Sequence, residues 1–192
     1  VHFESSDLLA MDRNQIRPMR IRQISAILPN AKSQLHPLVN VGDMIVGALQ
    51  AHEKIKKKQA QKRAIELLTM VGITDPESRL AAYPHELSGG MAQRICLAIS
   101  LMYQPKILVA DEPTAGLDVT IQRQVLDLTK DLAKEFNTAR LIITGDLGIA
   151  AHYCDRVAVM QAGKIVEANY TDKLFKNPVH PHTKQLLGSV QS

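Results

Sequence analysis

The stretch that decides the fold is residues 107–118, which read ILVADEPTAGLD. Four apolar residues lead directly into two adjacent carboxylates, Asp111 and Glu112, and a third acid, Asp118, follows. The apolar run does not alternate with polar residues, so it predicts a strand that is buried on both faces, as in a parallel sheet. Ligands bind beyond the carboxyl ends of such strands. Asp111 and Glu112 are therefore candidates for holding a cation or moving a proton.

Outward from this stretch, strands alternate with helices, which predicts an α/β domain with a largely parallel sheet. The segment 41–103 is mostly helical and is expected to form a lobe inserted between core strands. Residues 104–168 would be the core, and 169–192 a tail. The expected strands are part of 1–9, then 23–28, 107–110, 139–144 and a hairpin around QAGK; the expected helices are 41–53, 56–71, 91–103, 120–136, 147–154 and two short ones in the tail.

The composition narrows the class of protein. A hydrophobic share of 45% with 22% charged residues is typical of a globular chain rather than a disordered one. Aromatic residues make up only 4%, without Trp, which disfavours a surface that stacks single-stranded nucleic acid. Cys96 and Cys154 are far apart and form no CxxC pair, so neither a disulfide framework nor a zinc site is expected. No apolar run approaches the length of a membrane span.

Residues 86–94, ELSGGMAQR, carry the second chemical signal. Ser88, Gly89 and Gly90 stand directly before a predicted helix, where free N–H groups and the helix dipole favour an anion. The glycines allow a ligand to approach the backbone closely. SGG alone is equally typical of a Ser N-cap followed by turn glycines. The longer LSGGMAQR is more specific, because Gln93 and Arg94 fall on the first turns of the same helix.

The two carboxylates suit different steps of phosphate chemistry. Asp111, at the end of the strand, can hold Mg²⁺ through water. Glu112 is expected to point to the other side of the strand end, where it could polarise a water for attack on phosphorus. A pair of exposed acids at a strand end is the plainer interpretation of DE by itself, but its position shortly after LSGGMAQR favours the chemical one.

Together, LSGGMAQR, ILVADEPT and AGLD closely resemble the ATP-binding subunits of ABC transporters. They correspond there to the signature sequence, the Walker B strand and the D-loop. The resemblance extends over nearly the whole chain. The segments DLLAMDRNQIRPMR, RVAVMQAGKIVE and HPHTKQLLGSV are similar to the branch that imports oligopeptides, dipeptides and nickel.

The resemblance implies a P-loop NTPase-like fold and an ATPase that uses ATP and Mg²⁺. Two ATP-binding subunits would pair head to tail, with each ATP between the phosphate loop of one and the signature of the other. Ser88, Gly89, Gly90 and Gln93 would then bind the ATP held by the partner. By the same resemblance Asp111 would support Mg²⁺, Glu112 would be the general base, and Asp118 would couple the two sites.

The sequence departs from the family at three places. No G-x-x-x-x-G-K-[ST] phosphate loop occurs; in the family it precedes the segment matched by residue 1, so we expect that the N-terminal part of the domain is missing. Pro29 stands where the family has a Gln that reaches Mg²⁺ and the attacking water. Gly145 stands where the family has a His, so the triplet reads Thr144-Gly145-Asp146. We therefore expect an impaired ATP site of the chain's own and an intact signature for a partner's site.

The resulting hypothesis is an ATP-hydrolysing subunit of an importer for peptides or a related solute such as nickel. It would lie peripherally on the cytoplasmic face of the membrane, bound to transmembrane permease subunits and to a second ATP-binding subunit, without nucleic acid. The segment 41–103 would dock on the permease. Three alternatives stay open: a non-catalytic partner that keeps only the dimer interface, a decayed gene copy, and an ABC ATPase that acts on nucleic acid or ribosomes rather than in transport.

Two further segments favour plainer interpretations. The lysine-rich KIKKK at 54–58 is typical of a solvated helix face, with a partner contact as the alternative. His180 and His182 flank a proline in the tail, where they indicate a helix entry rather than a metal site.

Overall fold

The computed structural model describes residues 1–20 and 22–188. The chain divides into two compact units, residues 1–141 and 142–192, and each is described by itself. Within the described residues, no helix combines the length and the apolar content that crossing a membrane requires.

The first unit begins with a small hairpin rather than the single strand expected within 1–9. Glu4 has a φ of 53°, a left-handed conformation that turns the chain back and breaks the strand. The antiparallel strands are β1 (His2–Phe3) and β2 (Ser6–Asp7), and α1 (Arg13–Met19) follows. Asp12 caps α1 by accepting hydrogen bonds from two backbone amides, and the Gln15 side chain accepts from the Asp12 amide, which completes a capping box.

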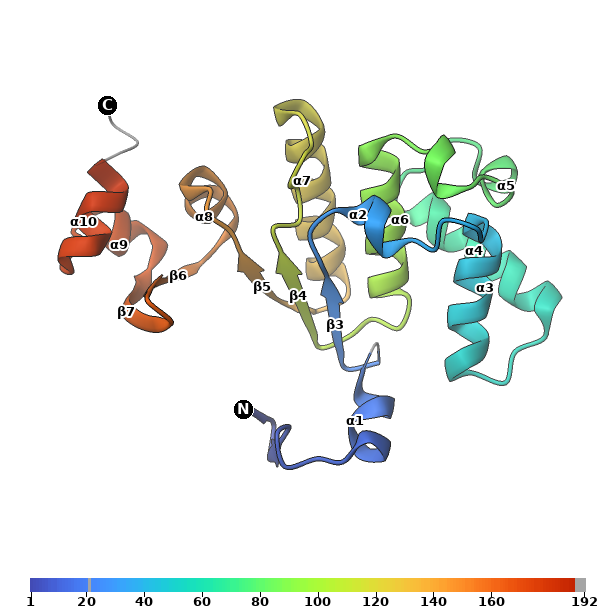
Figure 1. Ribbon diagram of the computed structural model, residues 1–192, viewed down its shortest axis with the longest axis horizontal. Coiled ribbons are helices and arrows are strands. Elements are labelled where there is room, and N and C mark those ends of the chain that lie inside the picture. Colours follow the sequence, from blue (N-terminus) through green and yellow to red (C-terminus); the bar gives the residue numbers. More distant parts are fainter. Residues whose placement is uncertain (21, 189–192) are drawn as a thin grey trace. The chain divides into compact units, whose positions relative to one another are not determined.

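The sheet of the first unit has the order β3-β4-β5, with β3 (Ile24–Ile27), β4 (Ile107–Asp111) and β5 (Ala139–Ile143). Strands β3 and β4 are parallel, with Ile24 opposite Ile107 and Ile27 opposite Ala110. Figure 1 shows the arrows of β3 and β4 side by side and pointing the same way. The long sequence separation between β3 and β4 is filled by helices, as a parallel connection requires. The α/β class with a parallel sheet is confirmed.

The prediction that 107–110 is buried on both faces was only half right. Leu108 and Ala110 are fully buried, whereas Ile107 and Val109 are half-buried, so burial alternates along β4. In β5 the prediction of a buried strand was wrong, because Leu141 is 55% and Ile143 49% exposed. Successive side chains point to opposite faces of a sheet. Helix α6 packs against β3 and covers one face of the sheet.

Three of the helices between β3 and β4, namely α3, α4 and α6, match the expected ones within about two residues, whereas the short α2, α5 and η1 were not expected. Asn40 begins α3 by accepting a hydrogen bond from the Asp43 amide. Helix α4 ends in a Schellman motif, because the Gly72 amide donates to Thr69 O and the Ile73 amide to Leu68 O, with a φ of +70° at Gly72. In chain order these elements are α2 (Ala31–Gln34), α3 (Val41–His52), α4 (Lys57–Met70), α5 (Pro76–Arg79), the 3₁₀-helix η1 (Pro84–Glu86) and α6 (Gly89–Leu101).

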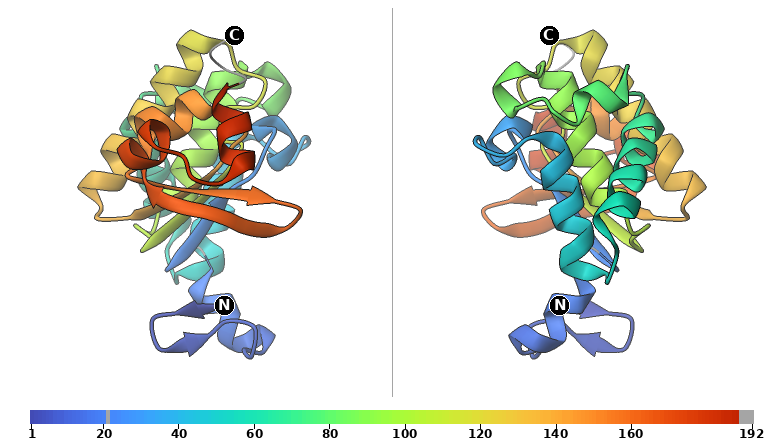
Figure 2. Two further views of the ribbon diagram at one scale, coloured as in Figure 1. Left: turned by 90° about the vertical axis from the view of Figure 1, so that its left-hand side faces the viewer. Right: turned by 90° about the vertical axis from the view of Figure 1, so that its right-hand side faces the viewer.

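These helices share one hydrophobic core with the sheet. The right-hand view of Figure 2 shows α3, α4 and α6 lying next to one another. Ile45, Leu68 and Ile95, one from each helix, are fully buried and join Ile27 of β3 and Leu108 of β4. The core therefore ties α6, which carries the signature sequence at its start, to the strand that carries the carboxylates at its end.

Helix α7 (Val119–Glu135) follows β4 and carries an apolar stripe. Val125 and Leu132 are buried, and Leu128 is partly buried against the core. Helix α7 packs against α6.

The second unit confirms the expected hairpin and the two tail helices. Strands β6 (Arg156–Gln161) and β7 (Lys164–Tyr170) pair antiparallel around Ala162 and Gly163, whose φ angles of 49° and 77° fit a type I′ turn. The unit also contains α8 (Leu147–Tyr153), α9 (Thr171–Lys176) and α10 (Pro181–Gly188). His180 accepts a hydrogen bond from the His182 amide through Nδ1, as expected for a helix entry.

Candidate functional site

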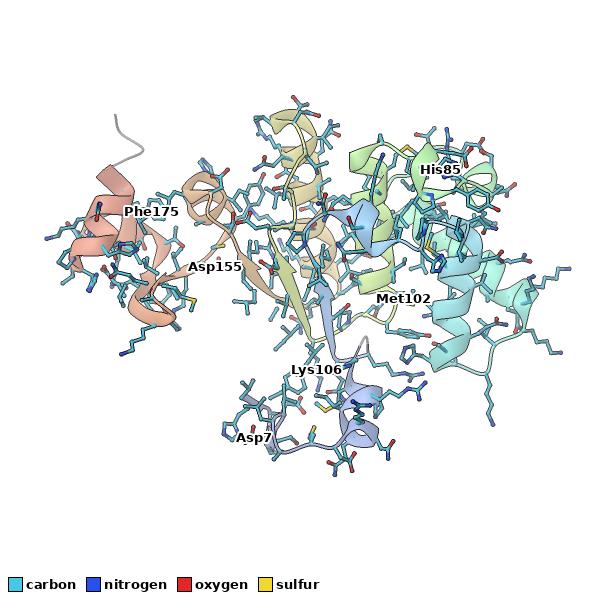
Figure 3. All side chains as sticks on the ribbon, viewed as in Figure 1. Asp7, His85, Met102, Lys106, Asp155 and Phe175 are labelled. Atoms are coloured by element: carbon cyan, nitrogen blue, oxygen red, sulfur yellow. The ribbon has the colours of Figure 1, made fainter. Side chains whose placement is uncertain are left out.

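Ser88 begins α6 and is exposed. Its Oγ accepts a hydrogen bond from the Met91 amide at 3.2 Å, which is the N-cap arrangement. The following amides, of Gly89 and Gly90, have no acceptor within the helix. Since Oγ acts as an acceptor in this bond, its proton is left to donate elsewhere. The start of α6 therefore presents donors that suit an anion. Figure 3 labels His85 in η1, the turn that leads into this helix.

Gly89 and Gly90 bring the starts of α6 and α7 together. A Cβ on Gly90 would lie 2.6 Å from Ile121 Cγ2, and one on Gly89 would lie 3.0 Å from Leu117 Cδ2. Both distances are shorter than an ordinary van der Waals contact. The signature glycines thus have a packing role beside any ligand role, and they place Ser88 next to the turn that follows the two carboxylates.

Asp111 is the last residue of β4, and Glu112 is the first residue after it. Both are half-buried. Glu112 has a φ of +43°, a left-handed conformation that is costly for a residue with a Cβ. The chain then turns tightly: the Ala115 amide donates to Glu112 O at 3.1 Å, and Gly116 has a φ of +78°. Asp111 shares its face of the strand with Ile107 and Val109, opposite to the fully buried Leu108 and Ala110.

Asp118 and Gln93 have local roles that the sequence did not indicate. Asp118 is the N-cap of α7, where Oδ1 accepts a hydrogen bond from the Ile121 amide at 3.0 Å. Gln93 is only 4% exposed, and its Nε2 is buried without a hydrogen-bond partner in the described part of the chain. Gln93 therefore lies inside the packing, unlike the exposed Ser88 and Gly89. The ligand-binding roles of Asp118 and Gln93 remain predictions.

Arg94, the last residue of LSGGMAQR, connects α6 to the end of α4 and to α7 by hydrogen bonds. Nη1 donates to Val71 O at 2.8 Å, and Nη2 lies 3.4 Å from Gln124 Oε1 of α7. A Cβ on Gly72 would lie 2.8 Å from Nη1. The guanidinium would have to shift for such a Cβ, and the φ of +70° at 72 independently favours glycine. A long-range hydrogen bond of this kind has no local sequence signal.

The loop after β3, where the family has its Gln, is held by a different side chain. Gln34 accepts a hydrogen bond from the Leu28 amide at 3.1 Å and donates Nε2 to Leu28 O. Pro29 and Asn30 are exposed at the tip, and Asn30 has a φ of 63°. Pro29 has no side-chain donor or acceptor, so this loop offers no polar group at the position of the family's Gln.

The triplet Thr144-Gly145-Asp146 lies in the second unit and forms the entry to α8. Asp146 Oδ1 accepts hydrogen bonds from the amides of Gly148 at 2.7 Å and Ile149 at 3.2 Å, and the Asp146 amide donates to Thr144 Oγ1 at 3.0 Å. The turn is therefore built by Thr144 and Asp146. Gly145 adds no side chain with which to contact a phosphate.

These groups fit a magnesium nucleotide in part. The hydroxyl and amides at the start of α6 suit phosphate oxygens. Asp111 suits Mg²⁺, which usually takes one or two carboxylates and completes its shell with water and phosphate. Among the described residues, no three His, Cys, Asp or Glu side chains converge as a metal cluster of their own. The chemistry would therefore depend on the nucleotide's own phosphates for the remaining ligands.

Curated proteins of similar sequence include two from Bacillus subtilis (strain 168). The chain is 48% identical over 188 residues to an oligopeptide transport ATP-binding protein, OppD, covering 98% of this chain and 52% of that protein. It is 46% identical over 188 residues to a dipeptide transport ATP-binding protein, DppD, covering 98% of this chain and 56% of that one. The chain thus spans about half the length of the curated relatives it matches.

Solved structures show the same fold. The cbiO1 protein from Clostridium perfringens, part of the ABC transporter complex cbiONQ, matches with a TM-score of 0.76 and 26% identity, covering 92% of this chain and 67% of that one. A dimeric ATP-binding cassette bound to ADP and Pi matches with a TM-score of 0.76 and 23% identity, covering 88% of this chain and 72% of that one. The model of the ABC transporter family matches residues 4–115, which include both the signature sequence and the carboxylates. The chain therefore belongs to the ABC transporter family.

Proposed function

We propose that this chain is an ATP-binding subunit of an ABC importer for peptides or a related small solute such as nickel. It would act as half of a head-to-tail pair and bind transmembrane permease subunits at the cytoplasmic face of the membrane. Support comes from its similarity to peptide-transport ATP-binding proteins over 98% of its length. The helical segment 41–103 would be the part that docks on the permease, as the resemblance to the family implies.

We propose further that the chain contributes to the binding and hydrolysis of its partner's ATP more than to those of its own ATP. One observation carries this proposal: the start of α6 presents Ser88 and two backbone amides for a phosphate, whereas Pro29 and Gly145 remove side chains that the family uses on its own ATP. An anion at the helix start is stabilised by the free N–H groups and by the dipole. The Ser88 hydroxyl would donate to a phosphate oxygen as negative charge develops there.

Glu112 has a different part in the same scheme. In a complete site it would accept a proton from the attacking water at a carboxylate oxygen while the bond to the leaving phosphate oxygen breaks. Glu112 would act on the ATP that this chain itself binds. Because Pro29 and Gly145 lack the side chains that would bind that ATP, Glu112 would rarely have a nucleotide beside it. Bound Mg²⁺ would supply charge neutralisation beside Asp111.

The test pairs this chain with an ATP-binding subunit that carries the complete set of motifs and measures ATP hydrolysis. Ser88→Asp keeps an N-cap acceptor but places a negative charge at the phosphate, so we expect hydrolysis to fall about a hundredfold or more, the loss typical of removing one stabilising donor. Ser88→Thr keeps both the cap and the hydroxyl and is the matched control. Glu112→Gln should change the rate by less than about twofold, since the removed base serves the impaired site.

Three outcomes would decide against the proposal. Unchanged hydrolysis with Ser88→Asp would show that the signature does not complete a partner's site. A large loss with Glu112→Gln would show that the chain's own site is active. Retained pairing without any hydrolysis that depends on Ser88 would favour the alternative of a non-catalytic partner.

A further inference from the structure

A cluster of lysines surrounds the connection between α3 and α4. This lysine patch consists of Lys54, Lys56, Lys57, Lys58 and Lys62, and all five residues are exposed. Only Lys62 has an acid within ion-pair distance, Glu66 at 4.0 Å; no carboxylate of the described residues lies so close to the other four. In Figure 3 the long side chains of this connection extend away from the ribbon.

The lysines at the start of α4 are unfavourable for helix formation. Lys56 stands at the N-cap of α4 without a side-chain cap, and the first turn contains Lys57 and Lys58 but no acid. Positive charge at a helix N-terminus is unfavourable because it faces the positive end of the dipole. By contrast, α6 and α7 begin with Ser88 and Asp118, which both cap their helices. A sequence that departs from the local rules of helix formation without a gain in packing points to a function at that place.

Helix α4 and the connection that carry the patch are held in place by buried contacts. Arg63 donates to both carboxylate oxygens of Glu53, at 3.0 and 2.9 Å, and to Met102 O at 2.9 Å. The opposite face of α4 is anchored by Ala60 and Leu68, which are fully buried. The lysines therefore project from a rigid support rather than from a free loop.

The chemistry of the patch favours a broad anionic surface. Residues 53–70 contain no aromatic side chain on which a nucleobase could stack. The exposed cations are lysines, which act as mobile point charges, whereas arginine would suit a bidentate contact with a single phosphate or carboxylate. Clusters of four to eight basic residues at a membrane surface bind anionic lipids.

We propose that the lysine patch docks on the anionic phospholipid headgroups of the membrane beside the permease. This inference rests on the proposed function for its location at a membrane. The attraction is electrostatic, so it weakens as salt shortens the Debye length. Each lysine neutralised near the surface should weaken binding about fivefold.

The test is sedimentation of the chain with vesicles of phosphatidylcholine alone or with added phosphatidylglycerol. One variant replaces four patch lysines with glutamine, Lys54, Lys56, Lys57 and Lys58. The control variant replaces four other exposed lysines in the same way, so that the net charge changes equally: Lys130, Lys134, Lys164 and Lys176. Because all eight side chains are exposed, both variants should fold, which circular dichroism and thermal melting verify. The assay contains neither ATP nor permease, so its failure leaves the proposed ATPase role standing.

We expect the chain to bind only the vesicles with phosphatidylglycerol. The patch variant, which lacks four lysines, should bind about six hundredfold more weakly, and the control variant should lose at most about fivefold. Equal losses in the two variants would overturn the proposal, because net charge alone would then explain the binding. Equal binding to vesicles without phosphatidylglycerol would overturn it as well. Binding of duplex DNA that depends on the patch, without vesicle binding, would assign the lysines to nucleic acid instead.

Discussion

Glu112 shows how a single residue departs from what its neighbours in the sequence indicate. The residue follows a strand, yet its φ of +43° turns the backbone sharply at the first position beyond β4. Such a conformation costs about 1–2 kcal/mol for a residue with a Cβ. Strained backbone of this kind is concentrated at functional sites. The turn residues Glu4 and Ala162 share this conformation, so the catalytic role of Glu112 stays a prediction that depends on its carboxylate and its place at the strand end.

Cys96 leads to a prediction at the same scale. Burial raises the pKa of the Cys96 thiol to about 12, and the side chain is 5% exposed. Since the thiolate is the reactive form, Cys96 should not react with a thiol reagent near neutral pH in the native chain. Cys154 is partly exposed and should react first.

The measurement is mass spectrometry of the labelled chain over time. Labelling of Cys96 should appear only in denaturant, and a Cys154→Ser variant isolates its rate. Labelling of Cys96 as fast as that of Cys154 under native conditions would contradict the buried position of α6 in the core.

At the scale of elements, the contact between the starts of α6 and α7 depends on Gly90. Gly90→Ala would place a Cβ 2.6 Å from Ile121 Cγ2, a branched side chain attached close to its backbone. We expect the free energy of unfolding to fall by about 1–3 kcal/mol, as for other overpacked sites. Gly47→Ala is the control, because Gly47 is an exposed residue in the middle of α3 with nothing within 4 Å of its added Cβ. This control should stabilise the chain by up to about 1 kcal/mol. Urea denaturation measures both, and equal effects would refute the packing role of Gly90.

Arg94 gives a second prediction for the same helix. Lysine cannot reproduce the two separate contacts of the guanidinium, with Val71 O and Gln124 Oε1. Arg94→Lys should therefore lower the free energy of unfolding by about 1–2 kcal/mol. The same denaturation series checks it. Stability equal to that of the unchanged chain would show that a positive charge at 94 is sufficient and that the guanidinium's second contact adds nothing.

In the second unit, we expect the local stability around Glu167 to depend on pH. The Thr183 hydroxyl and the amides of Val179 and His180 hold the pKa of Glu167 below its usual range, and both amides donate to it at 2.9 Å. Because the folded pKa is the lower one, the stabilisation is complete above the ordinary glutamate value of about 4.3 and is lost as pH falls through the native pKa. Exchange protection of the two amides should decline in that range. Glu167→Gln should remove the pH dependence, and an unchanged decline in that variant would contradict the assignment.

The elements also show how far the sequence could predict the structure. Periodicity placed α3, α4 and α7 within about a residue, since an apolar stripe and a cap determine a helix locally. Periodicity could not show that only one face of β4 is fully buried, because the burial of each face depends on which helices cover the sheet. The same limit holds for the site. Residue type and spacing are enough to propose Ser88, Asp111 and Glu112, whereas the close approach of Gly90 to Ile121 arises only from the packing of two helices.

At the scale of the whole molecule, a pair of subunits would hold two ATP molecules. The groups that this chain has kept would bind one of them, and the side chains that it lacks would bind the other. Ser88 and Gly89 at the start of α6 would face a partner's ATP, while Pro29 and Gly145 concern the chain's own. A pair formed with a complete subunit should therefore bind one nucleotide with high affinity, and a pair of two complete subunits should bind two.

Calorimetric titration with a non-hydrolysable ATP analogue measures this stoichiometry. The binding site that remains is expected to be the one made by the complete subunit's phosphate loop and this chain's signature, because donors at a helix start and a phosphate loop act together on one anion. Ser88→Asp should then weaken the single remaining site, whereas Asp111→Asn should leave it nearly unchanged, since Asp111 serves the other. Two tight sites per mixed pair, or a larger effect of Asp111→Asn than of Ser88→Asp, would show that this chain holds its own nucleotide despite Pro29 and Gly145.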